Sequence, residues 1–158
     1  MKVRRLVIFT PIKHQPGESF ERHETAYPNM IRSAIRLAEM SRNAKTPLKK
    51  RIVLYPPTQC GVATGSLLAQ LFHAKVAETP ELLPEKPHDM YCRDEDALAA
   101  VIKSYSLDYE FIILVTHINH ATTELFLTTN LGKLLSMSVP GWHMCQHSVI
   151  WECEPAQP

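Results

Sequence analysis

The sequence has no apolar run long enough to cross a membrane. Its apolar runs are short, such as LVIF at 6–9 and FIILV at 111–115 with four and five residues, whereas a helical span needs about 20. The basic start MKVRR precedes only the four-residue run, which is shorter than the ~7–15 apolar residues of a signal peptide. We therefore expect a cytoplasmic protein with no membrane partner.

The chain also lacks a dominant charge and closely spaced cysteines. It has 17 Lys and Arg against 16 Asp and Glu, a net charge of +1, which gives no field for nucleic acid. Its four cysteines are widely scattered, and without a secretion signal they favour free thiols over disulfides. We expect no nucleic-acid partner and no cofactor. The cysteines are Cys60, Cys92, Cys145 and Cys153.

The composition is that of an ordinary globular protein, with 45% hydrophobic and 21% charged residues in 158. This length fits one domain with a full-sized core. No repeat, low-complexity tract or long linker divides the chain. We expect a single domain at 1–153, followed by a loose tail, EPAQP, at 154–158.

Predicted strands alternate with predicted helices along the chain. Apolar periodicity predicts strands at 4–9 and 51–55, a short third strand within AKVAETPEL at 74–82, and strands at 111–116 and 145–152. It predicts helices from Pro28, at 61–72, at 93–105, and from the end of the fourth strand to about 131. Several of the strands are apolar on both faces, which is typical of a buried parallel sheet. The fold class is therefore α/β, a three-layer α/β/α sandwich with a mostly parallel central sheet.

In the predicted first helix, the residues expected to face the core follow helical spacing. They are Met30, Ile31, Ala34, Ile35 and Ala38.

His117 stands where a predicted buried strand ends, in the stretch IILVTHINH. In parallel α/β sheets the binding site lies beyond the carboxyl ends of the strands. This rule brings together three loops, at 10–19, 55–61 and 116–120. His117 is then a catalytic residue, a metal ligand or an incidental histidine at a strand end.

An ordered series of motifs resembles the histidine phosphatase superfamily, the phosphoglycerate-mutase-like proteins. RRLVIFT stands where the family has the strand leading into Arg-His-Gly, and IVLYPPTQCGVATGSLLAQLF resembles its strand, Ser-Pro-x-x-Arg motif and helix. ETPELLPE resembles the segment after that helix, FIILVTHIN the strand and Ser-His motif, and QHSVIWE the closing strand. The small phosphohistidine phosphatases are the closest in size. The resemblance implies a phosphoglycerate-mutase-like fold.

The resemblance also implies a chemistry. In the family, one histidine attacks a phosphoryl group, while a second histidine and two arginines hold the phosphoryl oxygens. His117 matches the second histidine, and Thr116 before it matches the small hydroxyl residue of that motif.

The first family motif is altered, and two alignments remain open. Without a shift, Thr10-Pro11-Ile12 replaces Arg-His-Gly and a proline stands at the nucleophile position. With a shift of three residues, Lys13-His14-Gln15 replaces it, but the strand must then continue through Pro11, which has no amide hydrogen. We favour the alignment without the shift.

The second motif is altered as well. Residues 55–59, Tyr-Pro-Pro-Thr-Gln, align with Ser-Pro-x-x-Arg and place Gln59 at the arginine position. Glutamine donates hydrogen bonds but carries no charge. Lys13 and the amides of the helix start at Gly61 would supply only part of the missing charge. The adjacent Cys60 is interpreted as a small buried residue rather than a reactive thiolate.

The leading hypothesis is a degenerate histidine-phosphatase-like protein, weak or inactive as a phosphatase. Its ligand- or phosphate-binding pocket surrounds His117, and its partner is a small phosphorylated ligand or a phosphoprotein. The pocket residues are Lys13, Thr10, Gln59 and Thr116.

The alternative is an active phosphohydrolase, a phosphomonoester or phosphohistidine phosphatase. In it, His14 is the nucleophile, while Lys13 and His117 hold the phosphoryl group.

A metal-binding module is the third hypothesis. His143, Cys145 and His147 alternate in sequence, so on one extended strand they would face the same side. Imidazole and thiolate are zinc ligands. The chain has no CxxC or HExxH spacing, so we assign no metal site.

Overall fold

A computed structural model of the chain describes residues 4–10, 26–42, 49–83, 95–116, 137–145 and 148–155. The strands are β1 (Arg5–Thr10), β2 (Arg51–Tyr55), β3 (Lys75–Glu78), β4 (Phe111–Val115), β5 (Met137–Cys145) and β6 (Ser148–Pro155). The helices are α1 (Ala26–Arg42), α2 (Gln59–Phe72), α3 (Glu95–Tyr105) and the short 3-10 helix η2 (Pro80–Leu82).

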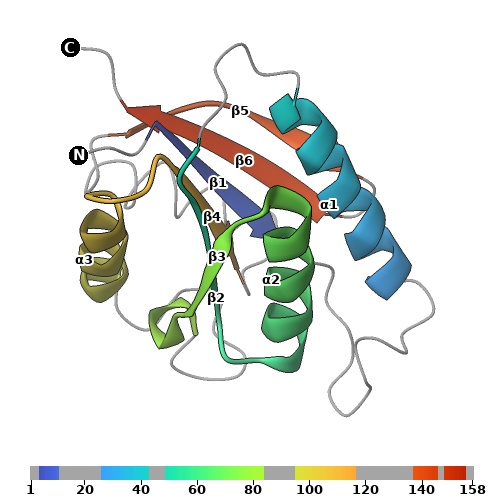
Figure 1. Ribbon diagram of the computed structural model, residues 1–158, viewed down its shortest axis with the longest axis horizontal. Coiled ribbons are helices and arrows are strands. Elements are labelled where there is room, and N and C mark those ends of the chain that lie inside the picture. The colour runs from blue at the N-terminus through green and yellow to red at the C-terminus, as the bar shows by residue number, and fades with distance from the viewer. Residues whose placement is uncertain are drawn as a thin grey trace.

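The six strands form one sheet in the order β3-β2-β4-β1-β6-β5 (Figure 1). The first four strands in this order are parallel, and β4 lies between β1 and β2. β6 runs antiparallel to β1, and β5 antiparallel to β6. The predicted mostly parallel sheet is confirmed.

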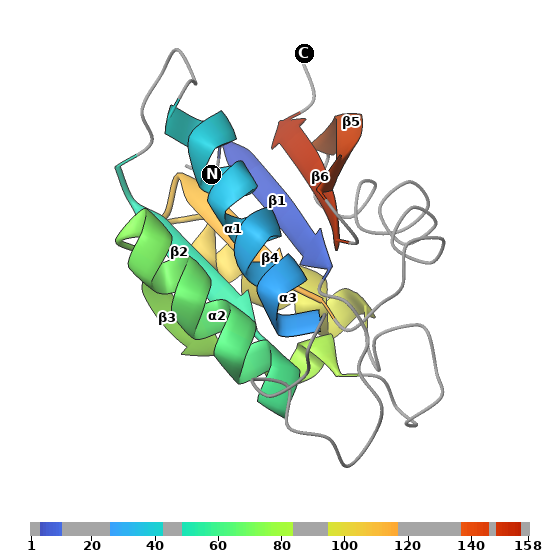
Figure 2. The same cartoon turned by 90° about the vertical axis from the view of Figure 1, so that its right-hand side faces the viewer.

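Helices cover both faces of the sheet, with α1 and α2 on one face and α3 on the other (Figures 1 and 2). Alternate residues of each strand enter opposite layers, as the pleat requires. Leu6 and Ile8 of β1 pack in the core beneath α3, whereas Val7 and Phe9 pack in the core beneath α1 and α2. Strands buried on both faces explain the uninterrupted apolar runs. The chain is thus a three-layer α/β/α sandwich.

The predicted elements from β1 to β4 are confirmed to within a few residues. The apolar stripe of α1 contains one error. Met30, Ala34 and Ala38 are buried as expected, but Ile35 is 44% exposed and Leu37 is fully buried in its place. The helix is therefore rotated slightly, so that position 37 joins the buried face. The helix predicted after β4 lies outside the described residues.

The carboxyl-terminal region differs from the prediction of a single strand at 145–152. It forms two antiparallel strands, with Cys145 at the end of β5 paired with Ser148 at the start of β6. Pro140 and Gly141 discourage a strand prediction, but the register of β5 shifts between Ser138 and Gly141, which accommodates them.

β6 also extends beyond the predicted end of the domain. It includes Glu154 and Pro155, which pair with Ser138 and Met137 of β5. These two residues therefore belong to the sheet rather than to the loose tail that the sequence predicts at 154–158.

Among the described helices, none is long and apolar enough to span a membrane.

Candidate functional site

The carboxyl ends of β1 and β4 lie side by side. Phe9 of β1 pairs with Val115 of β4, and the backbone amide of Thr116 donates a hydrogen bond to the carbonyl oxygen of Phe9 at 3.0 Å. Thr116 is buried, with 2% of its surface exposed, and Thr10 is the last residue of β1. Two of the predicted pocket positions, Thr10 and Thr116, therefore occupy neighbouring strand ends.

Gln59 is fixed by the turn that joins β2 to α2. The helix starts at Gln59, and Thr58 is its N-cap residue, with an extended backbone at φ −119° and ψ 159°. The Thr58 hydroxyl accepts a hydrogen bond of 2.9 Å from the Gly61 amide, which satisfies one of the unpaired donors of the first turn. The Gln59 side chain is exposed at this edge of the sheet.

Close packing holds the start of α2 against the end of β2. A Cβ atom at Gly61 would overlap the carbonyl oxygen of Pro56. A Cβ atom at Gly65 would lie 2.9 Å from the Cβ atom of Tyr55. Both positions therefore require glycine for a close approach rather than for an unusual backbone angle. The glycines allow the helix to pack closely against the strand, and this packing fixes the position of Gln59 at the start of α2.

Cys60, the next residue of α2, is buried, with 8% of its surface exposed. Its interpretation as a small buried residue is confirmed.

A further segment of this edge follows β3. The Thr79 amide donates a hydrogen bond of 2.7 Å to the carbonyl oxygen of Tyr55, and the Thr79 hydroxyl donates one of 3.1 Å to the carbonyl oxygen of Ala77. These bonds hold the chain against the end of β2 before it turns into η2. Two carboxylates, Glu78 and Glu81, belong to this segment.

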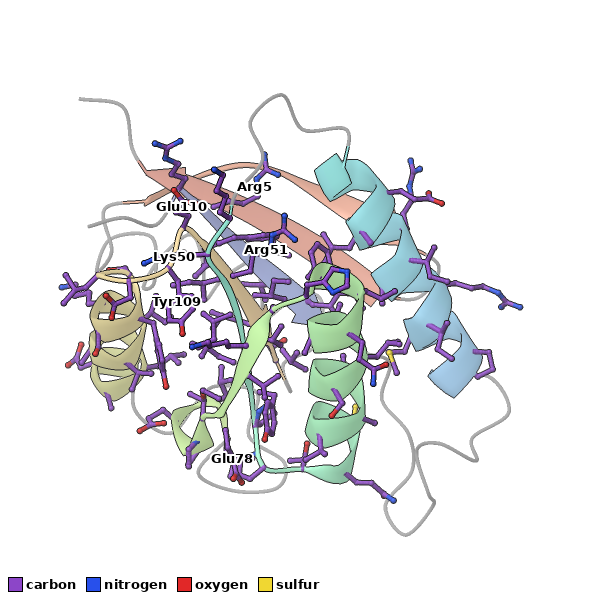
Figure 3. The ribbon with its side chains drawn as sticks, in the orientation of Figure 1. Arg5, Lys50, Arg51, Glu78, Tyr109 and Glu110 are labelled. Carbon is purple, nitrogen blue, oxygen red and sulfur yellow. The ribbon has the colours of Figure 1, made fainter. Side chains whose placement is uncertain are left out.

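The two ends of the parallel sheet carry opposite charges. The carboxyl edge has no lysine or arginine among the described residues that end or directly follow its strands. These are Thr10, 56–61, 79–83 and Thr116. The opposite, amino-terminal edge carries Arg4, Arg5, Lys49, Lys50, Arg51 and Lys75. Figure 3 shows the labelled Arg5, Lys50 and Arg51 at one end of the sheet and Glu78 at the other. Positive charge thus gathers on the side away from the expected site.

The remaining predicted site residues, Lys13, His14 and His117, lie outside the described residues, as does His120. The idea that His143, Cys145 and His147 share one strand is wrong, because β5 ends at Cys145 and β6 starts at Ser148. In the part of the chain that the structure describes, no three His, Cys, Asp or Glu side chains are grouped so that they could hold a metal ion.

This sheet order and helix arrangement matches the fold of two solved structures assigned as phosphohistidine phosphatases, in agreement with the phosphoglycerate-mutase-like fold that the sequence motifs predicted. A structure from Agrobacterium tumefaciens, assigned as the phosphohistidine phosphatase SixA, matches with a TM-score of 0.54 and 14% identity, over 83% of this chain and 80% of that one. A structure from Nakamurella multipartitia with the same assignment matches with a TM-score of 0.51 and 17% identity, over 72% of this chain and 59% of that one. No family model and no curated protein matches the sequence. At these identities the likeness defines the fold.

Sequence reasoning passed over the cationic group at the amino-terminal edge. A local signal existed in the run Lys49-Lys50-Arg51 directly before and at the start of a predicted strand. Lys75 joins this run only because β3 pairs with β2, with Ile52 beside Lys75.

Proposed function

We propose that this protein is a degenerate histidine phosphatase, weak or inactive in phosphoryl transfer, which binds a phosphorylated ligand at the carboxyl edge of its sheet. The ligand is a small phosphorylated molecule or a phosphoprotein of the cytoplasm, and His117 is its principal contact. The observation that carries the proposal is the position of Gln59. It is the first residue of α2, directly after the end of β2, where the family motif has arginine.

The physical argument concerns charge. Catalysis of phosphoryl transfer consists largely of positioning and of placing positive charge around the phosphoryl oxygens. A glutamine amide donates hydrogen bonds without charge, and no described residue at the end of β1, or directly following β2, β3 or β4, is a lysine or arginine. Loss of an arginine that stabilises such a transition state costs on the order of 10³–10⁵ in rate. Binding suffers less than turnover, since hydrogen bonds can still hold a ground-state ligand.

The end of β1 supports the alignment without a shift. β1 spans Arg5–Thr10, and its pairing with β6 reaches Thr10 opposite Val149. With the strand ending there, Thr10-Pro11-Ile12 takes the place of Arg-His-Gly, and a proline cannot act as a nucleophile.

An assay of phosphate release tests the proposal. The native protein is incubated with p-nitrophenyl phosphate beside the variants His14→Ala and His117→Ala. We expect native turnover within a few fold of both variants. Fast turnover that both substitutions abolish would contradict the proposal and favour an active phosphohydrolase with His14 as the nucleophile.

Ligand binding is measured separately, by calorimetric titration with a phosphohistidine analogue. We expect saturable binding that His117→Ala weakens at least tenfold. The matched control is Lys103→Gln, because Lys103 is an exposed cation on α3, near its last turn. Equal affinity in the native and His117→Ala proteins would remove His117 from the pocket.

A further inference from the structure

We propose a second ligand site, a cationic hollow at the amino-terminal edge of the sheet that binds a small molecule with two or more adjacent phosphate groups. The hollow has a volume of about 460 Å³, within the range of roughly 300–1,000 Å³ that is typical of small-molecule sites. Its lining residues are Lys49, Lys50, Arg51, His73, Lys75, Asp108 and Tyr109. It lies at the opposite end of the sheet from the pocket proposed around His117.

Three separate connections of the fold meet at this hollow. Lys49 and Lys50 precede β2, His73 follows α2 in the turn to β3, and Asp108 and Tyr109 lie between α3 and β4. Because β3, β2 and β4 are neighbours in the sheet, the three connections are brought to one edge. Residues as far apart in sequence as 49 and 109 therefore line a single hollow.

The charge of the lining points to a polyanion. Four permanent cations, three lysines and Arg51, face one carboxylate, Asp108. Among the described residues, the ammonium groups of Lys49, Lys50 and Lys75 have no carboxylate within 4.0 Å. The Glu110 carboxylate interacts with the charge of Lys49 at longer range, but the cations around the hollow still outnumber the carboxylates. Cations close together repel one another, and a bound polyanion removes that repulsion. One phosphate would meet only part of this charge, whereas adjacent phosphates reach several of the cations at once.

Backbone contacts hold the walls in place before any ligand arrives. The Lys49 amide donates a hydrogen bond of 2.9 Å to Oε2 of Glu110, and the amide of Glu110 donates one of 2.9 Å to the carbonyl oxygen of Lys50. The Nη1 atom of Arg51 donates one of 2.8 Å to the carbonyl oxygen of Phe72, the last residue of α2. Glu110 thus uses its carboxylate on the backbone of the lysine segment. Figure 3 shows Lys50, Arg51, Tyr109 and Glu110 at this end of the sheet.

His73 supplies an independent observation. It ends α2 in the left-handed conformation, with φ 49° and ψ 46°, and it is the only described residue other than glycine with a positive φ. Glycine is the favoured residue at such a helix end, because a side chain there is strained. The strained position carries an imidazole that lines the hollow, as expected where strain is retained at a binding site.

A purely structural explanation is that these cations only stabilise the carboxyl ends of helices. It accounts for Arg51, whose guanidinium contacts the last carbonyl of α2. It does not account for Lys49 and Lys50, which precede a strand, or for an imidazole at a position suited to glycine.

The test is a calorimetric titration of the full chain with inorganic tripolyphosphate at low ionic strength. We expect one saturable site per chain, weakened at least tenfold in the Lys49→Gln/Lys50→Gln/Lys75→Gln variant and unchanged in Lys103→Gln. His117→Ala retains the binding, so the result is independent of the function proposed above. We expect His73→Gly to raise the midpoint of thermal unfolding while it lowers the affinity, a combination that a purely structural role would not produce.

Two results would overturn the proposal. The first is the absence of saturable binding of tripolyphosphate. This result counts against the proposal even if the protein binds vesicles that carry phosphoinositide headgroups or long nucleic-acid strands. The second is an affinity in the triple variant equal to that of the native protein. A single Lys75→Gln substitution, at an exposed position, repeats the comparison with the least disturbance of the fold.

Discussion

The amide of Thr116 donates a hydrogen bond of 3.0 Å to the carbonyl oxygen of Phe9. This bond fixes the ends of β4 and β1 beside each other at the carboxyl edge of the sheet (Figure 1). His117 is the next residue after Thr116, and Pro11 follows Thr10. Two neighbouring strand ends are therefore followed in sequence by the histidine that matches the family motif and by the proline that does not.

Thr58 is expected to stabilise the start of α2. Thr58→Ala removes the hydroxyl that accepts the hydrogen bond from the Gly61 amide, and loss of such a cap costs about 0.5–2 kcal/mol in the free energy of unfolding. Urea denaturation followed by circular dichroism measures the change. Thr58→Ser keeps the hydroxyl and should stay within about a few tenths of a kcal/mol of native stability, because serine is also a favoured N-cap residue. Equal losses in both variants would contradict the capping role.

Gly61 is expected to respond to alanine in the opposite sense from an ordinary helical glycine. Alanine in place of glycine in an exposed helix interior usually stabilises by about 1 kcal/mol. At Gly61 the added methyl group would overlap the carbonyl oxygen of Pro56, so we expect a destabilisation of about 1–3 kcal/mol. Ser66→Ala, at an exposed position of the same helix, is the matched control. A Gly61→Ala protein as stable as this control would show that the packing is looser than described.

Glu110 links stability to acidic pH. Its pKa is lowered from the ordinary value of 4.5. The main cause is the hydrogen bond from the Lys49 amide. Desolvation opposes it and is second in size, and the Lys50 amide and the charges of Arg4 and Lys49 lower the pKa further. A carboxyl group with a lowered pKa in the folded state stabilises the fold above its unfolded pKa, and this contribution is lost as the pH falls through the folded value. We therefore expect Glu110→Gln to be less stable than the native protein at pH 7.

The measurement for Glu110 is the difference in unfolding midpoint between the native and Glu110→Gln proteins, from neutral pH to below the ordinary pKa of 4.5. The difference should be constant near neutrality and shrink once the pH falls below that value. Glu78→Gln, at the opposite end of the sheet (Figure 3), controls for loss of one negative charge. A difference between the native and Glu110→Gln proteins that grows in acid would have the wrong sign.

The central fold was predictable because its signals are local. The runs at β1 and β4 are apolar on both faces, and a strand of this kind needs helices on both sides. The layers beneath α3 and beneath α1 and α2 then follow from alternation along each strand.

The β5–β6 hairpin was not predictable in the same way. Pro140 and Gly141 weaken the strand pattern of β5, and only the register shift beside them explains how the strand tolerates both. The two residues between Cys145 and Ser148 in the sequence are neither glycine nor proline, so nothing in the local sequence divides the two strands.

The site was predictable in part. The motif order placed Gln59 between a strand and a helix predicted from Gly61, whereas the structure starts this helix at Gln59 itself. The gathering of Lys49, His73 and Lys75 depends on strand order rather than on spacing. Charge at the two ends of a sheet becomes visible only once the topology is known.

We propose that the carboxyl edge has the fold of a phosphatase site without its nucleophile and its charge. The most direct measurement compares kcat/KM for p-nitrophenyl phosphate in the native protein and in a variant carrying Thr10→Arg, Pro11→His, Ile12→Gly and Gln59→Arg. We predict a gain on the order of 100-fold or more in this variant, as expected when charged donors and a nucleophile are restored, and its loss again on adding His117→Ala. A native protein that already hydrolyses the substrate as fast as the restored variant, and that loses this activity in His14→Ala, would contradict the proposal of a degenerate site.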